Sequence, residues 1–262
     1  MRVQLPNGQN LHYLDAGEGP VLVLLHGWAM SSVVFADSVR ALSNNFRLLV
    51  PDLPGHGQSD PGPDFSLAAI AADIRIWLDT LKIDSYHLLG WSFGGQLAMQ
   101  LATDNIDKVE RMVLVASTPK FCQSDNWSHG LPDVQVRAMQ RRLQRDQEAT
   151  LDDFVNLMFT GEVDGTTLAA TVREQSIAPE HIAGREILAT LRLGDLRDQL
   201  AQISIPTLIH HGQDDSIIPV AAGQFLAEQI PDCELSIFND VGHAPFLSRP
   251  KQSQALWKEF LL

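Results

Sequence analysis

Residues 87–99 read HLLGWSFGGQLAM, and this stretch decides the fold. An apolar strand-like segment comes first, and residues 95–99 have helical spacing. The glycines at 90 and 94 let strand and helix approach closely, because glycine has no Cβ to clash. Ser92 therefore lies on a sharp turn that exposes its hydroxyl, beside a helix N-terminus that favours negative charge. We predict that Ser92 is a nucleophile; the alternative is a glycine-rich turn with an incidental serine.

Apolar segments and helical patterns alternate along most of the chain. Unbroken apolar runs lie at 21–25, 48–50, 112–115 and 207–209, with an alternating one at 235–238. Helical spacing occurs at 35–42, 67–81, 94–102, 222–229 and 252–260. Unbroken apolar runs are typical of strands buried on both faces of a mostly parallel sheet. The first sixteen residues predict a hairpin that turns at Asn7-Gly8. The sequence therefore predicts an α/β fold with helices flanking a mostly parallel central sheet.

The alternation stops between about Pro119 and Leu196. This stretch lacks convincing strands and contains several helical segments, among them Asp133–Arg145 and Leu151–Phe159. We therefore predict a core domain formed by 1–118 and 196–262, with a helical cap, 119–195, inserted between two strands of the sheet.

Composition narrows the class of function. The chain has 262 residues and a formal net charge of −13, which disfavours nucleic acid as a partner. No segment is long and apolar enough to span a membrane or resembles a signal peptide. Cys122 and Cys233 have no metal-ligand spacing and predict no disulfide framework. We expect a cytoplasmic monomer that does not bind membranes or metals.

A serine hydroxyl is a weak nucleophile at neutral pH and needs a base. His243 follows the last strand-like segment, where a loop can reach back over the carboxyl edge of the sheet. His210 and His211 end a strand and are expected to be structural, and His56 lies in a turn. We therefore predict that His243 is the general base.

The base must be held in one tautomer by a carboxylate. Two candidates follow the strand at 207–209, namely Asp214 and Asp215. The neighbouring residues do not decide which of the two carboxylates orients the histidine.

Four motifs resemble those of the α/β-hydrolase superfamily. They are LHGW at 25–28, DLPGHGQS at 52–59, GWSFGG at 90–95 and GHAPF at 242–246. More narrowly, the chain resembles the pimeloyl-[acyl-carrier-protein] methyl ester carboxylesterases of biotin synthesis. This resemblance rests on Trp91 before the serine, on ASTPKF at 116–121, on the segment 127–134, and on the GHAPF motif. The resemblance covers the chain nearly end to end.

The superfamily resemblance implies roles for further residues. Asp215 matches the position of the carboxylate in the pattern G-x-x-D-x-x-x-P, which leaves Asp214 as a turn residue. The order Ser92, Asp215, His243 is the order of the superfamily. The backbone N–H groups of Phe93 and Trp28 would form the oxyanion hole; alternatively, Trp28 only forms a wall of the acyl pocket.

The narrower resemblance implies hydrolysis of the methyl ester of a pimeloyl chain carried on acyl carrier protein, without metal or organic cofactor. Trp28, Ser92, Phe93 and His243 would contact the small acyl ester. So would the cap residues Phe154, Val155, Asn156, Leu157 and Met158. Of these, residues 154, 157 and 158 share one helix face and could line an acyl channel, or could instead pack inside the cap.

Docking of an acidic carrier protein calls for a basic cap. Arg137, Arg141 and Arg145 recur every four residues and predict one basic helix face, although such a face is often simply solvated. Acidic residues near the predicted channel, among them Asp152 and Asp153, oppose this docking.

Two alternatives to this function belong to the same superfamily: a broad-specificity esterase for short acyl chains and a carbon–carbon bond hydrolase. A haloalkane dehalogenase is disfavoured because that chemistry needs a carboxylate at the position of Ser92. A non-catalytic receptor that uses the same pocket is disfavoured by the presence of all three predicted catalytic residues.

Overall fold

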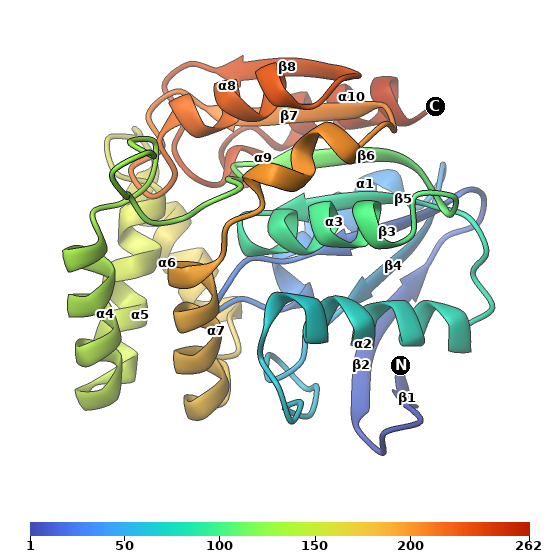
Figure 1. The fold of residues 1–262 in the computed structure, drawn as a ribbon, viewed down its shortest axis with the longest axis horizontal. Coiled ribbons are helices and arrows are strands. Elements are labelled where there is room, and N and C mark those ends of the chain that lie inside the picture. Colours follow the sequence, from blue (N-terminus) through green and yellow to red (C-terminus); the bar gives the residue numbers. More distant parts are fainter.

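The computed structural model describes all 262 residues and is built around one eight-stranded sheet with the order β1-β2-β4-β3-β5-β6-β7-β8 (Figure 1). The strands are β1 (Arg2–Gln4), β2 (Asn10–Ala16), β3 (Val21–Leu25), β4 (Arg47–Pro51), β5 (Tyr86–Trp91), β6 (Val109–Val115), β7 (Thr207–Gly212) and β8 (Cys233–Phe238). β1 and β2 form the antiparallel hairpin at one edge. β2 also pairs antiparallel with β4, and the pairs among β3 to β8 are parallel, which confirms the predicted α/β-hydrolase fold.

Helices cover both faces of the sheet. The α-helices of the core are α1 (Ala36–Leu42), α2 (Leu67–Thr80), α3 (Phe93–Asp104), α8 (Val220–Gln229), α9 (Pro245–Ser248) and α10 (Pro250–Leu261). α2 and α3 lie on the near face in Figure 1, whereas α1 packs beside α10 on the far face. None of the helices combines the length and apolar character needed to cross a bilayer.

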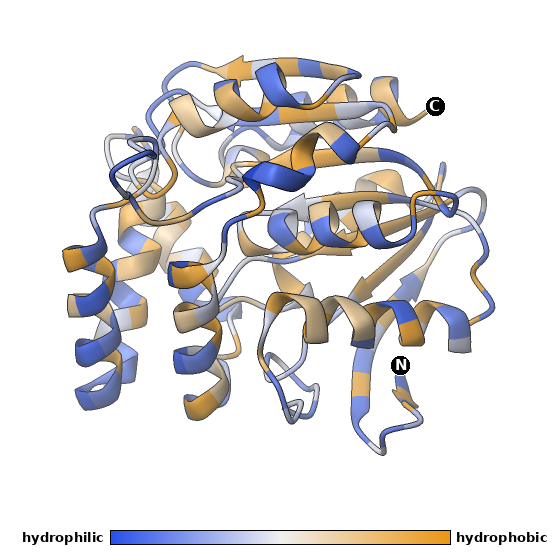
Figure 2. Cartoon of the chain, in the orientation of Figure 1, coloured by the Kyte–Doolittle hydropathy of each residue, from blue (hydrophilic) through white to orange (hydrophobic).

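The apolar runs of the sequence form the core of this sheet. Every residue of β5 and β7 is buried, and four of the five residues of β3 are. Much of α4 is blue in Figure 2, in keeping with its many arginine and glutamine residues. β8 is an edge strand with no fully buried residue, so its sequence alternates instead of being apolar throughout.

Four helices stand together beside the sheet, between β6 and β7 in the chain (Figure 1). They are α4 (Asp133–Arg145), α5 (Gln147–Met158), α6 (Gly165–Gln175) and α7 (His181–Leu193). α4 has the predicted bounds. α5 begins four residues before the predicted Leu151, because the Asp146 side chain caps it by accepting a hydrogen bond from the Ala149 N–H at 3.0 Å. We refer to these four helices and their connections as the cap.

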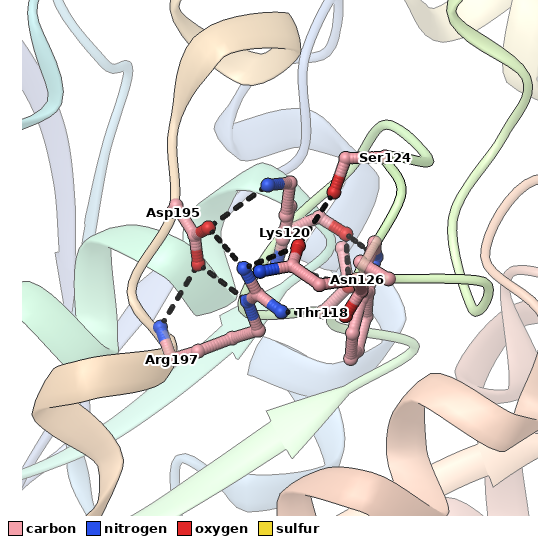
Figure 3. Close-up of polar contacts among 7 residues, drawn as sticks. Thr118, Lys120, Ser124, Asn126, Asp195 and Arg197 are labelled. Atoms are coloured by element: carbon pink, nitrogen blue, oxygen red, sulfur yellow. Dashed lines mark hydrogen bonds and ion pairs between the residues drawn. The ribbon is translucent and has the colours of Figure 1, made fainter.

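The chain enters and leaves the cap at adjacent points. The Leu196 N–H donates to the Pro119 carbonyl at 2.9 Å, which ties the outgoing segment to the returning one. Beside this bond the Asp195 carboxylate pairs with Lys120 at 2.9 Å and with Arg197 at 2.7 Å (Figure 3). Ion pairs and a backbone bond therefore join the two crossings.

A short loop after β6 completes this junction. The Arg197 guanidinium donates to both the carbonyl and the side-chain oxygen of Asn126, and it lies 5.5 Å from the centre of the Trp127 ring. The Lys120 carbonyl accepts from the Trp127 indole at 2.9 Å and from the Thr118 hydroxyl at 2.7 Å. Figure 3 shows these groups converging on one side of the crossing.

Replacing Asp195 with asparagine should destabilise the protein at neutral pH. Hydrogen bonds from Arg197 and Lys120 hold the pKa of the Asp195 carboxyl well below its usual range. A lowered folded-state pKa contributes stability above the unfolded value of about 3.9, and that contribution is lost as pH falls below it. Because water screens this partly exposed carboxylate, we expect a loss of about 1 kcal/mol at pH 7.

Urea unfolding of wild type and Asp195→Asn between pH 7 and pH 3 measures this effect. The difference in unfolding free energy should be constant above about pH 4 and should shrink below it. Asp198→Asn, which changes an exposed carboxylate next to the same arginine, is the matched control and should have little effect. Identical unfolding of Asp195→Asn and wild type at pH 7 would contradict the prediction.

Candidate active site

Ser92 lies between the end of β5 and the start of α3, in the strained turn that the sequence predicts. Its backbone has φ 56° and ψ −115°, a conformation that a non-glycine residue rarely adopts. A Cβ at Gly90 would lie 2.3 Å from the Gly94 carbonyl oxygen, and one at Gly94 would lie 2.1 Å from that of Leu25. Only glycine therefore fits on either side of this turn.

His243 lies in the loop after β8, and the core holds it at two points. Its Nδ1 is 2.8 Å from the Asp215 Oδ2, and its carbonyl accepts from the Trp91 indole N–H at 2.9 Å. The imidazole is buried, and its Nε2 has no hydrogen-bond partner. Since Trp91 directly precedes Ser92, this contact places His243 beside the turn, with one ring nitrogen free to accept a proton.

Asp215 is held in one orientation by its neighbours. Its Oδ1 accepts the backbone N–H groups of Ile217 and Ile218, both at 2.8 Å, which leaves Oδ2 for His243. The other candidate, Asp214, is exposed and makes no side-chain contact with His243. Of the two carboxylates, the structure brings Asp215 to His243, the predicted base.

The Asp215 carboxylate remains charged in spite of its burial. Burial alone would raise its pKa, but electrostatic attraction and hydrogen bonds from His243 and His211 hold that pKa well below its usual range. The Nε2 of His211 lies 3.4 Å from Oδ2. A buried anion beside Nδ1 favours the tautomer in which Nδ1 carries the proton and Nε2 is the acceptor.

Two backbone N–H groups beside Ser92 are free to bind a negative charge. Phe93 is the first residue of α3, so its N–H has no partner within the helix. Trp28 follows Gly27, where an added Cβ would lie 3.3 Å from the Ser92 Cβ, and its N–H donates to no backbone carbonyl. The structure therefore places both predicted donors close to Ser92, and their role as an oxyanion hole stays a prediction.

Neutral histidines support the loop that carries Trp28. His26 Nε2 accepts the Leu53 N–H at 3.0 Å, and His56 Nε2 accepts the Ala29 N–H at 3.2 Å. Burial lowers the pKa of His56 to about 3, and burial also lowers the pKa of His26. Both rings therefore remain neutral at pH 7, as acceptors must, and they hold the loop without adding charge.

The predicted cap contacts divide by exposure. Phe154, Val155 and Met158 are buried, whereas Asn156 and Leu157 are exposed. The Phe154 ring meets the Trp28 indole edge-on at 4.9 Å between centroids. The Trp28 indole N–H donates to the Gly184 carbonyl in α7 at 2.8 Å, so both α5 and α7 contact this side chain.

A cavity of about 380 Å³ adjoins the loop that carries Trp28. Ala29 and Met30 of that loop, Leu151 and Val155 of α5, and Arg173 of α6 contribute to its wall. Five of its nine lining residues are hydrophobic, and neither Ser92 nor His243 is among the nine.

Residues 20–250 match the family model described as the alpha/beta hydrolase fold. The chain belongs to the α/β-hydrolase family. In this α/β-hydrolase the four predicted functional segments, around Trp28, Ser92, Asp215 and His243, follow the carboxyl ends of parallel strands, where ligands bind in open α/β sheets.

Relatives of this α/β-hydrolase include proteins named pimeloyl-[acyl-carrier protein] methyl ester esterase. The one from Nitrosomonas europaea is 39% identical over 249 residues, covering 93% of this chain and 96% of the relative. The one from Nitrosospira multiformis is 35% identical, with 93% and 95% covered. Among solved structures, an esterase from Exiguobacterium antarcticum has a TM-score of 0.94 at 26% identity, covering 99% of this chain and 98% of that one. An enol-lactonase from Burkholderia xenovorans has a TM-score of 0.89 at 25% identity, covering 100% and 99%.

Sequence reasoning missed several contacts of this α/β-hydrolase that hold the site together. Trp91 is distinctive in the sequence, but nothing local to it indicates a hydrogen bond to His243. Glu162 accepts the Gly242 N–H at 2.8 Å across 80 residues of chain, a contact with no signal in either segment. His56 could have been found, because its turn motif follows the strand next to β3.

Proposed function

We propose that this chain hydrolyses the methyl ester of pimeloyl-[acyl-carrier protein], releasing methanol and the free carboxylate in biotin biosynthesis. It is a carboxylic ester hydrolase of the α/β-hydrolase family. The observation that carries the chemistry is the buried Asp215–His243 pair beside the strained turn at Ser92. The substrate assignment is supported by the names of relatives 39% and 35% identical over more than nine-tenths of their length.

In the proposed acylation step, the Ser92 Oγ attacks the ester carbonyl carbon while the Nε2 of His243 takes its proton. This requires the oxygen and the nitrogen to approach to about 3 Å in the substrate complex. The carbonyl oxygen becomes negative and accepts the N–H groups of Trp28 and Phe93. His243 then gives the proton to the leaving methoxy oxygen, so that methanol departs and an acyl-serine remains.

In the proposed deacylation step, water replaces methanol. His243 takes a proton from the water as its oxygen attacks the acyl carbon, and it returns that proton to the Ser92 Oγ as the bond to serine breaks. Asp215 stays ionised throughout and stabilises the imidazolium that forms in each half of the reaction.

A basic groove on the cap is the proposed docking site of the carrier protein. It has a volume of about 280 Å³ and is lined by Arg137 and Arg141 of α4 and by Arg185 of α7. Arg137 pairs with Asp133 at 2.5 Å, whereas Arg141 takes part in no ion pair. Arg185 lies 4.0 Å from Glu186, which also lines the groove, so that pairing is weak. An acidic partner would therefore meet cations that are available for pairing.

The acidic residues that oppose docking in the sequence are paired in the structure. Asp153 binds Arg142 of α4, and Asp152 binds Arg173 of α6. Both carboxylates are thus partly neutralised within the cap, and they leave the groove between α4 and α7 basic.

For the setting of the reaction we propose a monomer in the cytoplasm. Cys122 and Cys233 are unpaired, which suits a reducing compartment. Burial raises the pKa of the Cys122 thiol to about 11 and that of Cys233 to about 12, so both remain protonated and unreactive.

Arg141→Glu should weaken hydrolysis of the carrier-borne ester without affecting small esters. Reversing one charge in the docking groove is expected to raise the KM for pimeloyl-[acyl-carrier protein] methyl ester about tenfold at low salt, with the effect shrinking as salt rises. Turnover of p-nitrophenyl butyrate should be unchanged because its small acyl group does not reach the groove. Methanol release measures the first reaction, and absorbance the second.

The matched control is Arg75→Glu, which reverses an exposed and unpaired arginine on α2. Its KM for the carrier-borne ester should stay close to that of wild type. Equal effects of the two variants would count against the groove. Failure of the wild type to hydrolyse the carrier-borne ester, with rapid turnover of p-nitrophenyl butyrate, would favour a broad-specificity esterase instead.

A further inference from the structure

The cap contacts the backbone of the loop that carries His243. The connection between α5 and α6 supplies two acceptors for two consecutive N–H groups of that loop. The His243 N–H donates to the Met158 carbonyl at 2.9 Å, and the Gly242 N–H donates to the Glu162 Oε1 at 2.8 Å. The backbone N–H of His243, the proposed general base, is therefore bonded to the cap, whereas its imidazole is bonded to Asp215 in the core.

The approach of the two segments is close. A Cβ at Gly242 would lie 2.3 Å from the Met158 carbonyl oxygen and 3.1 Å from the Glu162 Oε1. Any side chain at Gly242 would displace the cap from the loop. The glycine before the histidine, present in the GHAPF motif, is thus explained by contact with the cap.

The carboxylate of Glu162 has no hydrogen-bond partner other than the Gly242 N–H. It takes part in no ion pair, and its Oε2 is buried without a hydrogen bond. Withdrawing a carboxylate oxygen from water without a partner costs stability. A carboxylate used only to stabilise the cap would be better placed at the surface or opposite a cation. Its single bond, to Gly242, points to a role at the site.

The core holds the same loop from the other side. Trp91 donates to the His243 carbonyl, and Asp215 holds the imidazole. The Asp214 N–H also donates to the Val241 carbonyl at 3.0 Å, just before Gly242. None of these core contacts engages the N–H groups of Gly242 and His243, and the bonds to Met158 and Glu162 add that restraint.

We propose that Glu162 is a positioning residue that couples the placement of the cap to the orientation of His243. The inference rests on the proposed roles of Ser92 and His243. When the cap is in contact with the loop, Glu162 and Met158 hold the histidine backbone so that Nε2 faces Ser92. When the cap moves away, the loop loses two bonds and the base loses its alignment. The site is therefore complete only when the cap is in place over the substrate.

Glu162→Ala is expected to lower kcat for p-nitrophenyl butyrate about 10- to 100-fold, with little change in KM, because misplacing a catalytic group slows chemistry more than binding. Glu162→Gln keeps an oxygen acceptor at the same distance and should recover most of kcat. The rate at which a fluorophosphonate labels Ser92 should fall in parallel with kcat, since the label needs the same base.

Two further variants make the test decisive. Asp146→Ala removes a similar carboxylate-to-amide bond at the other end of α5 and should keep kcat within about twofold of wild type. If Glu162→Ala does not fold, Glu162→Asp takes its place, since it keeps the charge but withdraws the oxygen from Gly242. Circular dichroism and thermal unfolding monitor the fold of every variant.

The proposal is overturned if the Glu162 variants keep wild-type kcat, if Gln and Ala lose equally, or if Asp146→Ala loses as much. Ser92→Ala and His243→Ala are measured alongside. Activity that survives in those two would refute the catalytic roles themselves, whereas their inactivity together with an unaffected Glu162→Ala would refute the coupling alone.

Discussion

Ser92→Ala is expected to lower kcat/KM for p-nitrophenyl butyrate by about 100,000-fold while leaving the protein folded. Losing the nucleophile of a serine hydrolase removes the covalent route, and only the binding site and oxyanion donors still contribute. The hydroxyl makes no hydrogen bond that the fold needs, since Ser92 is bonded through its backbone: its N–H donates to the Val115 carbonyl and its carbonyl accepts from the Gly95 N–H, both at 2.9 Å. Alanine keeps both bonds.

Ser117→Ala provides the matched control for this prediction. Ser117 is a fully buried serine next to the same turn, and its Oγ donates to the Val115 carbonyl at 3.0 Å. Its loss should cost about 1 kcal/mol of stability and little activity. A folded Ser92→Ala protein that retains wild-type turnover, or that still reacts with a fluorophosphonate, would exclude Ser92 as the nucleophile.

Asp215→Asn is expected to lower kcat about 10,000-fold. The Asp215 Oδ2 accepts from the His243 Nδ1 at 2.8 Å, and an amide nitrogen at this position would donate instead. The imidazole would then carry its proton on Nε2 and could not take one from Ser92. The backbone bonds to Ile217 and Ile218 can persist through the remaining amide oxygen, so we expect the variant to fold.

Asp214→Asn is the control for this prediction because the two aspartates are neighbours in the same loop. Asp214 is exposed, and its replacement should leave kcat within about twofold of wild type. Steady-state kinetics of both variants against p-nitrophenyl butyrate decides between the two carboxylates. A large loss in Asp214→Asn with an active Asp215→Asn would reverse the assignment.

The sheet could be predicted from the sequence because its signals are local. Each buried strand is an apolar run, and the turn at Ser92 requires glycines on both sides for steric reasons. Ser92 and His243 were recognisable because motifs surround them. The choice of Asp215 over Asp214 needed knowledge of the family, since both follow the same strand and only their exposure separates them.

The cap was less predictable. α6 contains three threonines and a glycine, residues with weak helix propensity, and its helical state depends on packing against its neighbours. The spacing of Phe154, Leu157 and Met158 predicted one apolar stripe, but Leu157 is 39% exposed. Helical periodicity shows which residues share a face; it does not show what covers that face.

Contacts between segments far apart in the chain could not be predicted from the sequence, because no local pattern indicates them. Glu162 lies 80 residues from Gly242, and the Trp91 indole reaches a carbonyl 152 residues away. Both bonds involve a backbone group of the His243 loop, which every sequence would supply. Only the folded chain reveals which side chains meet them.

The adjacent crossings at Pro119 and Leu196 have a consequence for how such a protein can diversify. The residue at which the chain enters the cap and the residue at which it leaves are joined by one hydrogen bond. The sheet therefore does not constrain the length of the segment between them. A different helical cap could replace this one while the order of the strands and the turn at Ser92 stay the same. The replacement would still have to supply acceptors for the N–H groups before and at His243, so substrate range could change freely only within that geometric condition.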